Sequence, residues 1–194
     1  LVTVSADSPI TSGKALVERI RADPAALSFA FSAAPGNHNH IVIGMIFKAA
    51  GADPKKAKVV IQKSGGVGMT SILGGHIDVA FDNVGSVFRR IRTGEVRALA
   101  VMDTQRSRFL PDVPTTPELG FPTVISNSTR GIAGPKGIPA PVIKRLQEVF
   151  KKAMEDPEHV KKMDEAGLAL KIMVGEEYAK YYRELHAKAA KYTE

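Results

Sequence analysis

The chain has 194 residues, of which 44% are hydrophobic and 24% charged. This composition can bury a core and excludes a disordered or collagen-like polypeptide. At about 150 residues per domain, the length fits one large or two small domains. The sequence has no cysteine, which excludes disulfides, thiolate metal sites and cysteine nucleophiles. No apolar run reaches the ~18 residues of a membrane span, and the N-terminus lacks the basic and apolar regions of a signal peptide.

The net charge of +7, from 27 Lys and Arg against 20 Asp and Glu, favours an anionic partner. Residues 1–135 carry 15 basic and 10 acidic side chains, whereas 136–194 carry 12 and 10. Only 6% of residues are aromatic and none is Trp, so the stacking platforms of single-strand nucleic-acid binders are lacking. We therefore expect no nucleic acid as partner, whereas an anionic small molecule and a lipid surface both stay open on charge alone.

Strands and helices alternate over the first hundred residues. Apolar runs, apolar periodicity and capping residues predict, in chain order, strand 1–4, helix 12–21, strand 27–31, helix 41–49, strand 59–61, helix 69–73, strand 77–81, helix 86–92 and strand 97–101. This alternation predicts an α/β fold, with a parallel sheet covered by helices on both faces.

The second half of the chain is richer in proline and in helix. Four prolines within 109–122 predict an extended surface excursion without helix or central strand. Beyond it we expect, in order, strands 123–126 and 131–133, helices 142–155 and 156–167, strand 170–173, and a final helix from Glu176.

Three loops of small and polar residues follow predicted strands and precede predicted helices. In a parallel sheet such loops meet at one edge, where free backbone N–H groups and helix dipoles favour anions. The candidate ligand-binding residues are Ser32, Gly36, Asn37, His38 and Asn39 in the first loop, Gly65 and Gly66 in the second, and Asp82 and Asn83 in the third. The pattern suits a carboxylate or a phosphate, although Gly, Ser and Asn are also ordinary loop residues.

No constellation of catalytic residues stands out. The sequence lacks a Gly-x-Ser-x-Gly elbow, a P-loop and a Gly-x-Gly-x-x-Gly turn. His38 and His40, with Asp78 and Asp82 downstream, lack the spacing of metal ligands on a helix face. We expect no enzyme activity, no metal and no cofactor.

Several motifs resemble those of the substrate-binding proteins of tripartite tricarboxylate transporters, the Bug-type receptors. They are LSFAFS at 27–32, FKAAG at 47–51, LGGHIDVAFDN at 73–83, GEVRALAV at 94–101, LPDVPT at 110–115 and GIAGPKGIP at 131–139. The resemblance implies a two-domain, class II periplasmic-binding-protein-like fold. It also implies a periplasmic protein that captures a small carboxylate, such as a di- or tricarboxylate, and delivers it to membrane permease subunits.

Members of this family are longer, so the resemblance implies that the chain lacks their N-terminal segment. Residues 1–125 are then the ligand-binding α/β domain, and 126–194 belong to the otherwise missing first domain. Surfaces left uncovered in this way favour self-association.

Asp82 is expected to orient Asn83 and neighbouring donors, or to receive an ammonium or hydroxyl group of the ligand. His38 and the run 33–35 depart from the Ser and Gly usual there.

Two other functions stay open on the sequence alone. The effector-binding domain of a LysR-type transcription regulator shares the fold class, the size and the small carboxylate ligands. A fragment of a transferase acting on a phosphorylated anion is the third interpretation, and the lack of a catalytic constellation argues against it.

Overall fold

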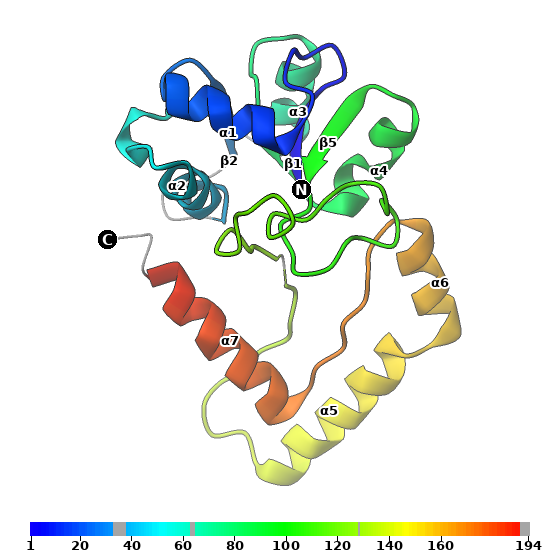
Figure 1. Cartoon of the computed structure of the whole chain (residues 1–194). Helices are drawn as coiled ribbons and strands as arrows, with labels where there is room; N and C mark the ends of the chain where they lie inside the picture. Colours follow the sequence, from blue (N-terminus) through cyan, green and yellow to red (C-terminus); the bar gives the residue numbers. More distant parts are fainter. Residues whose placement is uncertain (33–37, 63–64, 128, 191–194) are drawn as a thin grey trace. The chain divides into compact units, whose positions relative to one another are not determined.

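The computed structural model describes residues 1–32, 38–62, 65–127 and 129–190 (Figure 1). The chain divides into two compact units, Leu1–Asn127 and Ser128–Tyr192. The first contains β1 (Val2–Ser5), α1 (Gly13–Ala22), β2 (Ser28–Ser32), α2 (His38–Ala50), the 3-10 turn η1 (Pro54–Lys56), β3 (Lys58–Gln62), α3 (Gly65–Leu73), β4 (Ala80–Phe81), α4 (Val84–Arg92) and β5 (Val96–Ala100). The second contains α5 (Ala140–Met154), α6 (Pro157–Glu165) and α7 (Gly175–Ala190).

The five strands of the first unit follow one another in the order β3-β2-β4-β1-β5. β2 and β3 pair in parallel, and an isolated parallel bridge between Phe29 and Val79 joins β2 to the chain entering β4. β1 pairs antiparallel with both β4 and β5. The predicted parallel direction is therefore correct for four strands and wrong for β1. An apolar run does not encode strand direction, and a helical connection can return the chain either way.

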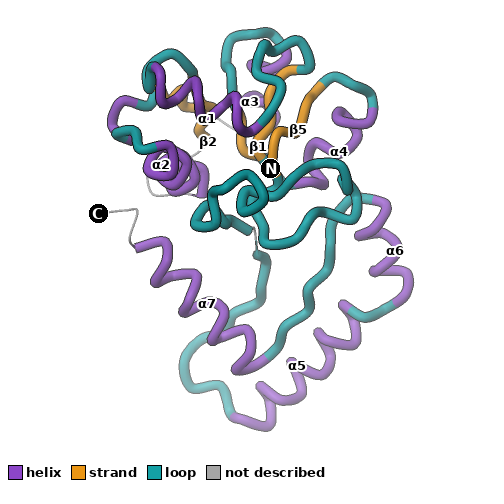
Figure 2. The backbone as a smooth tube through the Cα atoms, in the orientation of Figure 1, coloured by secondary structure: helices purple, strands orange, loops and turns teal. Residues whose placement is uncertain are grey.

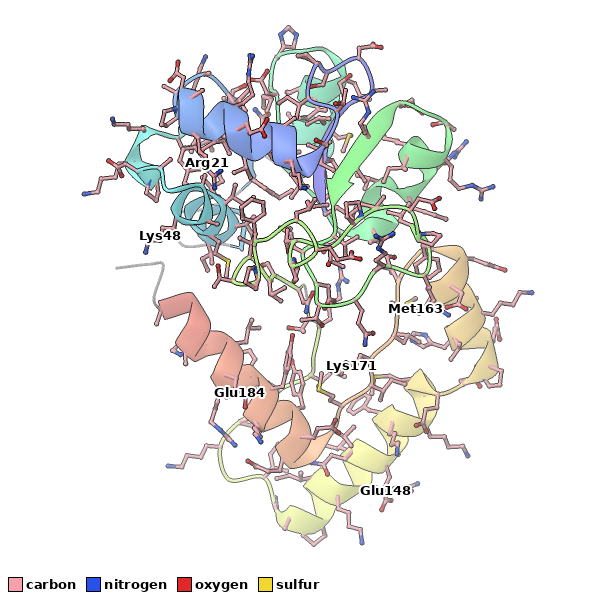
Figure 3. The ribbon with its side chains drawn as sticks, in the orientation of Figure 1. Arg21, Lys48, Glu148, Met163, Lys171 and Glu184 are labelled. Atoms are coloured by element: carbon pink, nitrogen blue, oxygen red, sulfur yellow. The ribbon has the colours of Figure 1, made fainter. Side chains whose placement is uncertain are left out.

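Helices cover both faces of this sheet (Figure 2). The fully buried Phe29 of β2 meets Phe47 of α2 edge-on, with ring centroids 5.4 Å apart. Its neighbour Ala30 points to the opposite face and packs in the cluster that includes α3. On the α2 face, the guanidinium of Arg21 on α1 donates to the carbonyl of Ala50 at 3.1 Å (Figure 3). The predicted α/β class is confirmed, with helices on either side of the strands.

The proline-rich excursion has no helix and no regular strand, as predicted, but it is not confined to the surface. Thr115 and Thr116 are 2% and 4% exposed, and the pair Val101–Thr115 forms a parallel bridge beyond β5. The Thr116 hydroxyl donates to the Val124 carbonyl at 2.5 Å. Because these buried hydroxyls have hydrogen-bond partners, burying this loop against the sheet carries little desolvation penalty.

Three predicted strands are not strands in the structure: 123–126, 131–133 and 170–173. In the first, the Val124 N–H bonds back to the Phe121 carbonyl in a turn, so it is not available to a sheet. The second predicted strand, 131–133, is exposed throughout, begins with Gly131 and is followed by Gly134. Glycine weakens strands, which explains why this one does not form. Short apolar runs are ambiguous without a pairing partner, and the described part of the second unit offers no strand.

The helix α5 carries exposed apolar side chains along one face. The α5 stripe consists of Val142, Ile143, Leu146 and Val149, which are 41–46% exposed and follow the spacing of one helical face. Glu148, labelled in Figure 3, belongs to the charged side of this helix and lines an open groove between α5 and α6. These four side chains belong to the exposed large hydrophobic residues of the described ranges.

Candidate functional site

Three helices begin directly after three neighbouring parallel strands. β3, β2 and β4 lie side by side, and α3, α2 and α4 respectively follow them. Ser32 at the end of β2 pairs with Gln62 at the end of β3, so these ends are level in the sheet. The starts of the three helices therefore gather at one edge, where unpaired backbone N–H groups and helix dipoles present positive potential.

The candidate residues from the sequence lie at this edge as far as the structure describes them. Ser32 ends β2, His38 and Asn39 begin α2, Gly65 and Gly66 begin α3, and Asp82 and Asn83 connect β4 to α4. Gly36 and Asn37 lie outside the described residues. Ser32, His38 and Asn39 are placed by their backbone alone, so the side chains that can be analysed at the edge are those of the third loop.

Asp82 is held by the antiparallel strand β1. Its carboxylate Oδ2 accepts a hydrogen bond from the Thr3 hydroxyl at 2.7 Å. The backbones of Asp82 and Leu1 exchange two N–H···O bonds, 2.7 and 3.2 Å long, which extend the β1–β4 ladder by one pair. Burial raises the pKa of Asp82, while the hydrogen bond from Thr3 acts in the opposite direction.

Asn83 is the N-cap of α4, yet its side chain makes no capping hydrogen bond. The polar N-caps of other elements use their side chains: Ser12, Asp53 and Asp156 each accept from a backbone N–H of the first turn. The Asn83 amide is therefore not engaged by its own helix. It can donate to a ligand at the edge without breaking a cap.

The electrostatics of the edge also suit an anion. The first turns of α2, α3 and α4 contain no acidic residue, so no carboxylate within those turns neutralises the helix dipoles. In α6 and α7 of the second unit, by contrast, the first turns hold Glu158 and the pair Glu176 and Glu177. At the edge, the one acid among the described residues that adjoins a helix start is Asp82.

Across the described ranges, no three His, Asp or Glu side chains come close enough to share an ion. The open groove between α5 and α6 contains none of the candidate residues. Within the same ranges, none of the helices is both long and apolar enough to cross a bilayer.

Sequence reasoning missed Thr3. The residue lies in a predicted strand, but its partner Asp82 is 79 positions away. Only the pairing of β1 with β4, with Thr3 opposite Ala80, brings the hydroxyl to the carboxylate. A polar residue inside an otherwise apolar strand is the one signal that could have drawn attention to it.

The model of the tripartite tricarboxylate transporter family receptor matches residues 1–193 of the chain. The chain belongs to this family. The match decides between the two families that the sequence left open, and it supports the predicted class of fold. The receptors of this family are solute-binding proteins.

Among relatives, the BugT protein of Bordetella pertussis is 29% identical over 141 residues, which cover 73% of this chain and 42% of BugT. A solved structure described as a periplasmic transporter has a TM-score of 0.79 and 27% identity, and the match covers 100% of this chain and 62% of that one. MatC from Rhodopseudomonas palustris, solved with bound malate, has a TM-score of 0.80 at 17% identity, with 100% and 64% covered. The receptor chain thus spans less than two thirds of the length of each.

Proposed function

We propose that this receptor captures a small carboxylate outside the cytoplasm and passes it to permease subunits of a tripartite tricarboxylate-type transporter. The observation that carries the proposal is the gathering of three helix starts at the ends of β3, β2 and β4. Membership of the receptor family supports it independently. The malate bound to MatC is consistent with a small organic acid as ligand.

The ligand's carboxylate is held without chemistry. Backbone N–H groups of the first turns of α2, α3 and α4 donate to its oxygens, and the free amide of Asn83 adds a side-chain donor. Charge-assisted hydrogen bonds of this kind are stronger than neutral ones. Ser32, Gly36, Asn37, His38, Asn39, Gly65 and Gly66 complete the proposed site, with the glycines allowing the ligand to approach the backbone.

We also propose that residues 126–194 belong to a domain that other parts of the complete protein build. The exposed α5 stripe supports this, because an amphipathic helix in a stable domain buries its apolar face. The greater length of the relatives supports it as well. On this proposal residues 1–125 supply one side of the ligand cleft.

The test of the site is a pair of isosteric substitutions that add one negative charge each. Asn83→Asp places a carboxylate at the N-cap of α4, which suits the helix but repels an anionic ligand. Asn127→Asp makes the same change at an exposed residue outside the site. Malate binding is measured by calorimetry on the protein expressed from its complete gene.

We expect Asn83→Asp to raise the Kd for malate at least about tenfold, equivalent to ~1.4 kcal/mol, and Asn127→Asp to leave it unchanged. The neutral dimethyl ester of malate should not bind either form. Equal Kd values for the Asn83 variant and the parent protein, or tight binding of the ester, would count against a carboxylate at this edge.

A further inference from the structure

Thr3 is a polar residue in an apolar stretch of the sheet. It is 0% exposed, as is Val4, and the neighbouring Val2 is 2% exposed. A valine would fill nearly the same volume in a strand, so packing alone does not require the hydroxyl. Buried hydroxyls are retained where they have a partner.

The partner that the Thr3 hydroxyl has is Asp82. The Thr3 Oγ1 lies 2.7 Å from the Asp82 Oδ2 and 3.2 Å from the Ala80 carbonyl oxygen. A hydroxyl carries a single proton, and the shorter contact to an ionised acceptor takes it, because charge-assisted hydrogen bonds are stronger. The χ1 angle of a threonine in a strand is restricted, so the donor comes from a fixed direction.

This bond leaves the two carboxylate oxygens unequal. Oδ2 is occupied by Thr3, whereas Oδ1 has no hydrogen-bond partner among the described residues. Every fully buried side-chain nitrogen or oxygen in the described ranges has a partner, so Oδ1 is not fully buried. An acceptor oxygen is thus presented beside the start of α4, next to the unengaged amide of Asn83.

We infer that Thr3 is a positioning residue, which fixes the Asp82 carboxylate so that Oδ1 accepts a hydrogen bond from a hydroxyl or ammonium group of the ligand. The inference rests on the proposed function, since it concerns a ligand at the same edge. A carboxylate beside an anion site repels a plain diacid and favours one that carries a donor. The ligand class narrows to hydroxy- or amino-substituted carboxylates.

The experiment compares Thr3→Val, which removes the hydroxyl at constant shape, with Thr3→Ser, which keeps it. Kd values for malate, aspartate and succinate are measured on the protein expressed from its complete gene. These probes are a hydroxy-diacid, an amino-diacid and a diacid with no donor. Malate or aspartate should bind more tightly than succinate, and Thr3→Val should reduce that preference about three- to tenfold. Thr3→Ser should retain it.

A second readout does not need a ligand. The carbon resonance of the Asp82 carboxyl reports its pKa, which the Thr3 hydrogen bond lowers. The pKa of Asp82 should rise in Thr3→Val and stay near the parent value in Thr3→Ser. The three proteins differ only at position 3, so every other group that acts on Asp82 is the same in each.

The outcomes separate the inference from the function on which it rests. Failure of the parent protein to bind any of the three acids would overturn the proposed function, and the titration would still test the Thr3 bond. An equal loss of affinity for all three acids in Thr3→Val would mark Thr3 as merely structural. That result, or an unmoved pKa of Asp82, would overturn the inference.

Discussion

Ionisation of Asp82 is unfavourable for the stability of the fold, but the proposed contact with the ligand uses the ionised carboxylate. Its carboxylate lies at an edge where helix starts attract anions, yet burial raises its pKa because desolvation disfavours the charged form. A residue whose ionisation lowers the stability of the fold, and which still lies beside a ligand site, is typical of functional positions. The sequence could predict Asp82 as a candidate from its place after a strand. It could not predict the bond from Thr3, which depends on long-range strand pairing.

Asp82→Asn tests this conflict through the dependence of stability on pH. The folded-state pKa of Asp82 lies above its ordinary value of 3.8, so the folded protein binds more protons between the two values. The stability contributed by protonated Asp82 is therefore lost as pH rises through that window. Asparagine keeps an acceptor for Thr3 without the charge.

We expect the melting temperature of Asp82→Asn to exceed that of the parent at pH 7, with the gain shrinking towards pH 3. Thermal melts over this range measure it. Asp7→Asn, at an exposed aspartate, should show no such trend. A melting temperature for Asp82→Asn below that of the parent at neutral pH would mean that the ionised carboxylate stabilises the fold.

Local patterns predict most elements well, because their ends carry chemical signals. Ser12 caps α1 through its side chain, and Asp156 does so for α6. Glycines with positive φ follow several elements, such as Gly51 after α2 at 73°. The direction of β1 and the false strand 170–173 depend on partners elsewhere in the chain, which no local window contains.

The α5 stripe leads to a prediction about association. Leu146→Glu places a charge in the middle of the exposed stripe, and should change the free energy of unfolding by no more than about 0.5 kcal/mol because 41% of Leu146 is already exposed. It should reduce self-association of the 194-residue chain, as measured by sedimentation velocity.

Lys144→Ala is the matched control for Leu146→Glu, since it changes the net charge by the same amount and leaves the stripe intact. Its sedimentation should resemble that of the parent chain. A chain that is monomeric before any substitution would contradict the expectation of self-association. A Leu146→Glu variant that unfolds would show that the stripe is covered.

At the scale of the whole molecule, family membership and the helix starts at one edge of the sheet support the same proposed function. The family match extends over residues 1–193, and the relatives are longer than this chain. The sequence predicted the class of fold because strand–loop–helix repeats have few alternative packings. The predicted assignment of 1–125 and 126–194 to different domains of a longer receptor stays a prediction, since it depends on segments outside these residues.

The most direct test of the account is hydrogen–deuterium exchange with and without saturating malate, on the protein expressed from its complete gene. We predict slower exchange at the first turns of α2, α3 and α4 together, and no change at the start of α1, whose cap is already engaged by Ser12. Malate binding without protection at these three helix starts would contradict the proposed site.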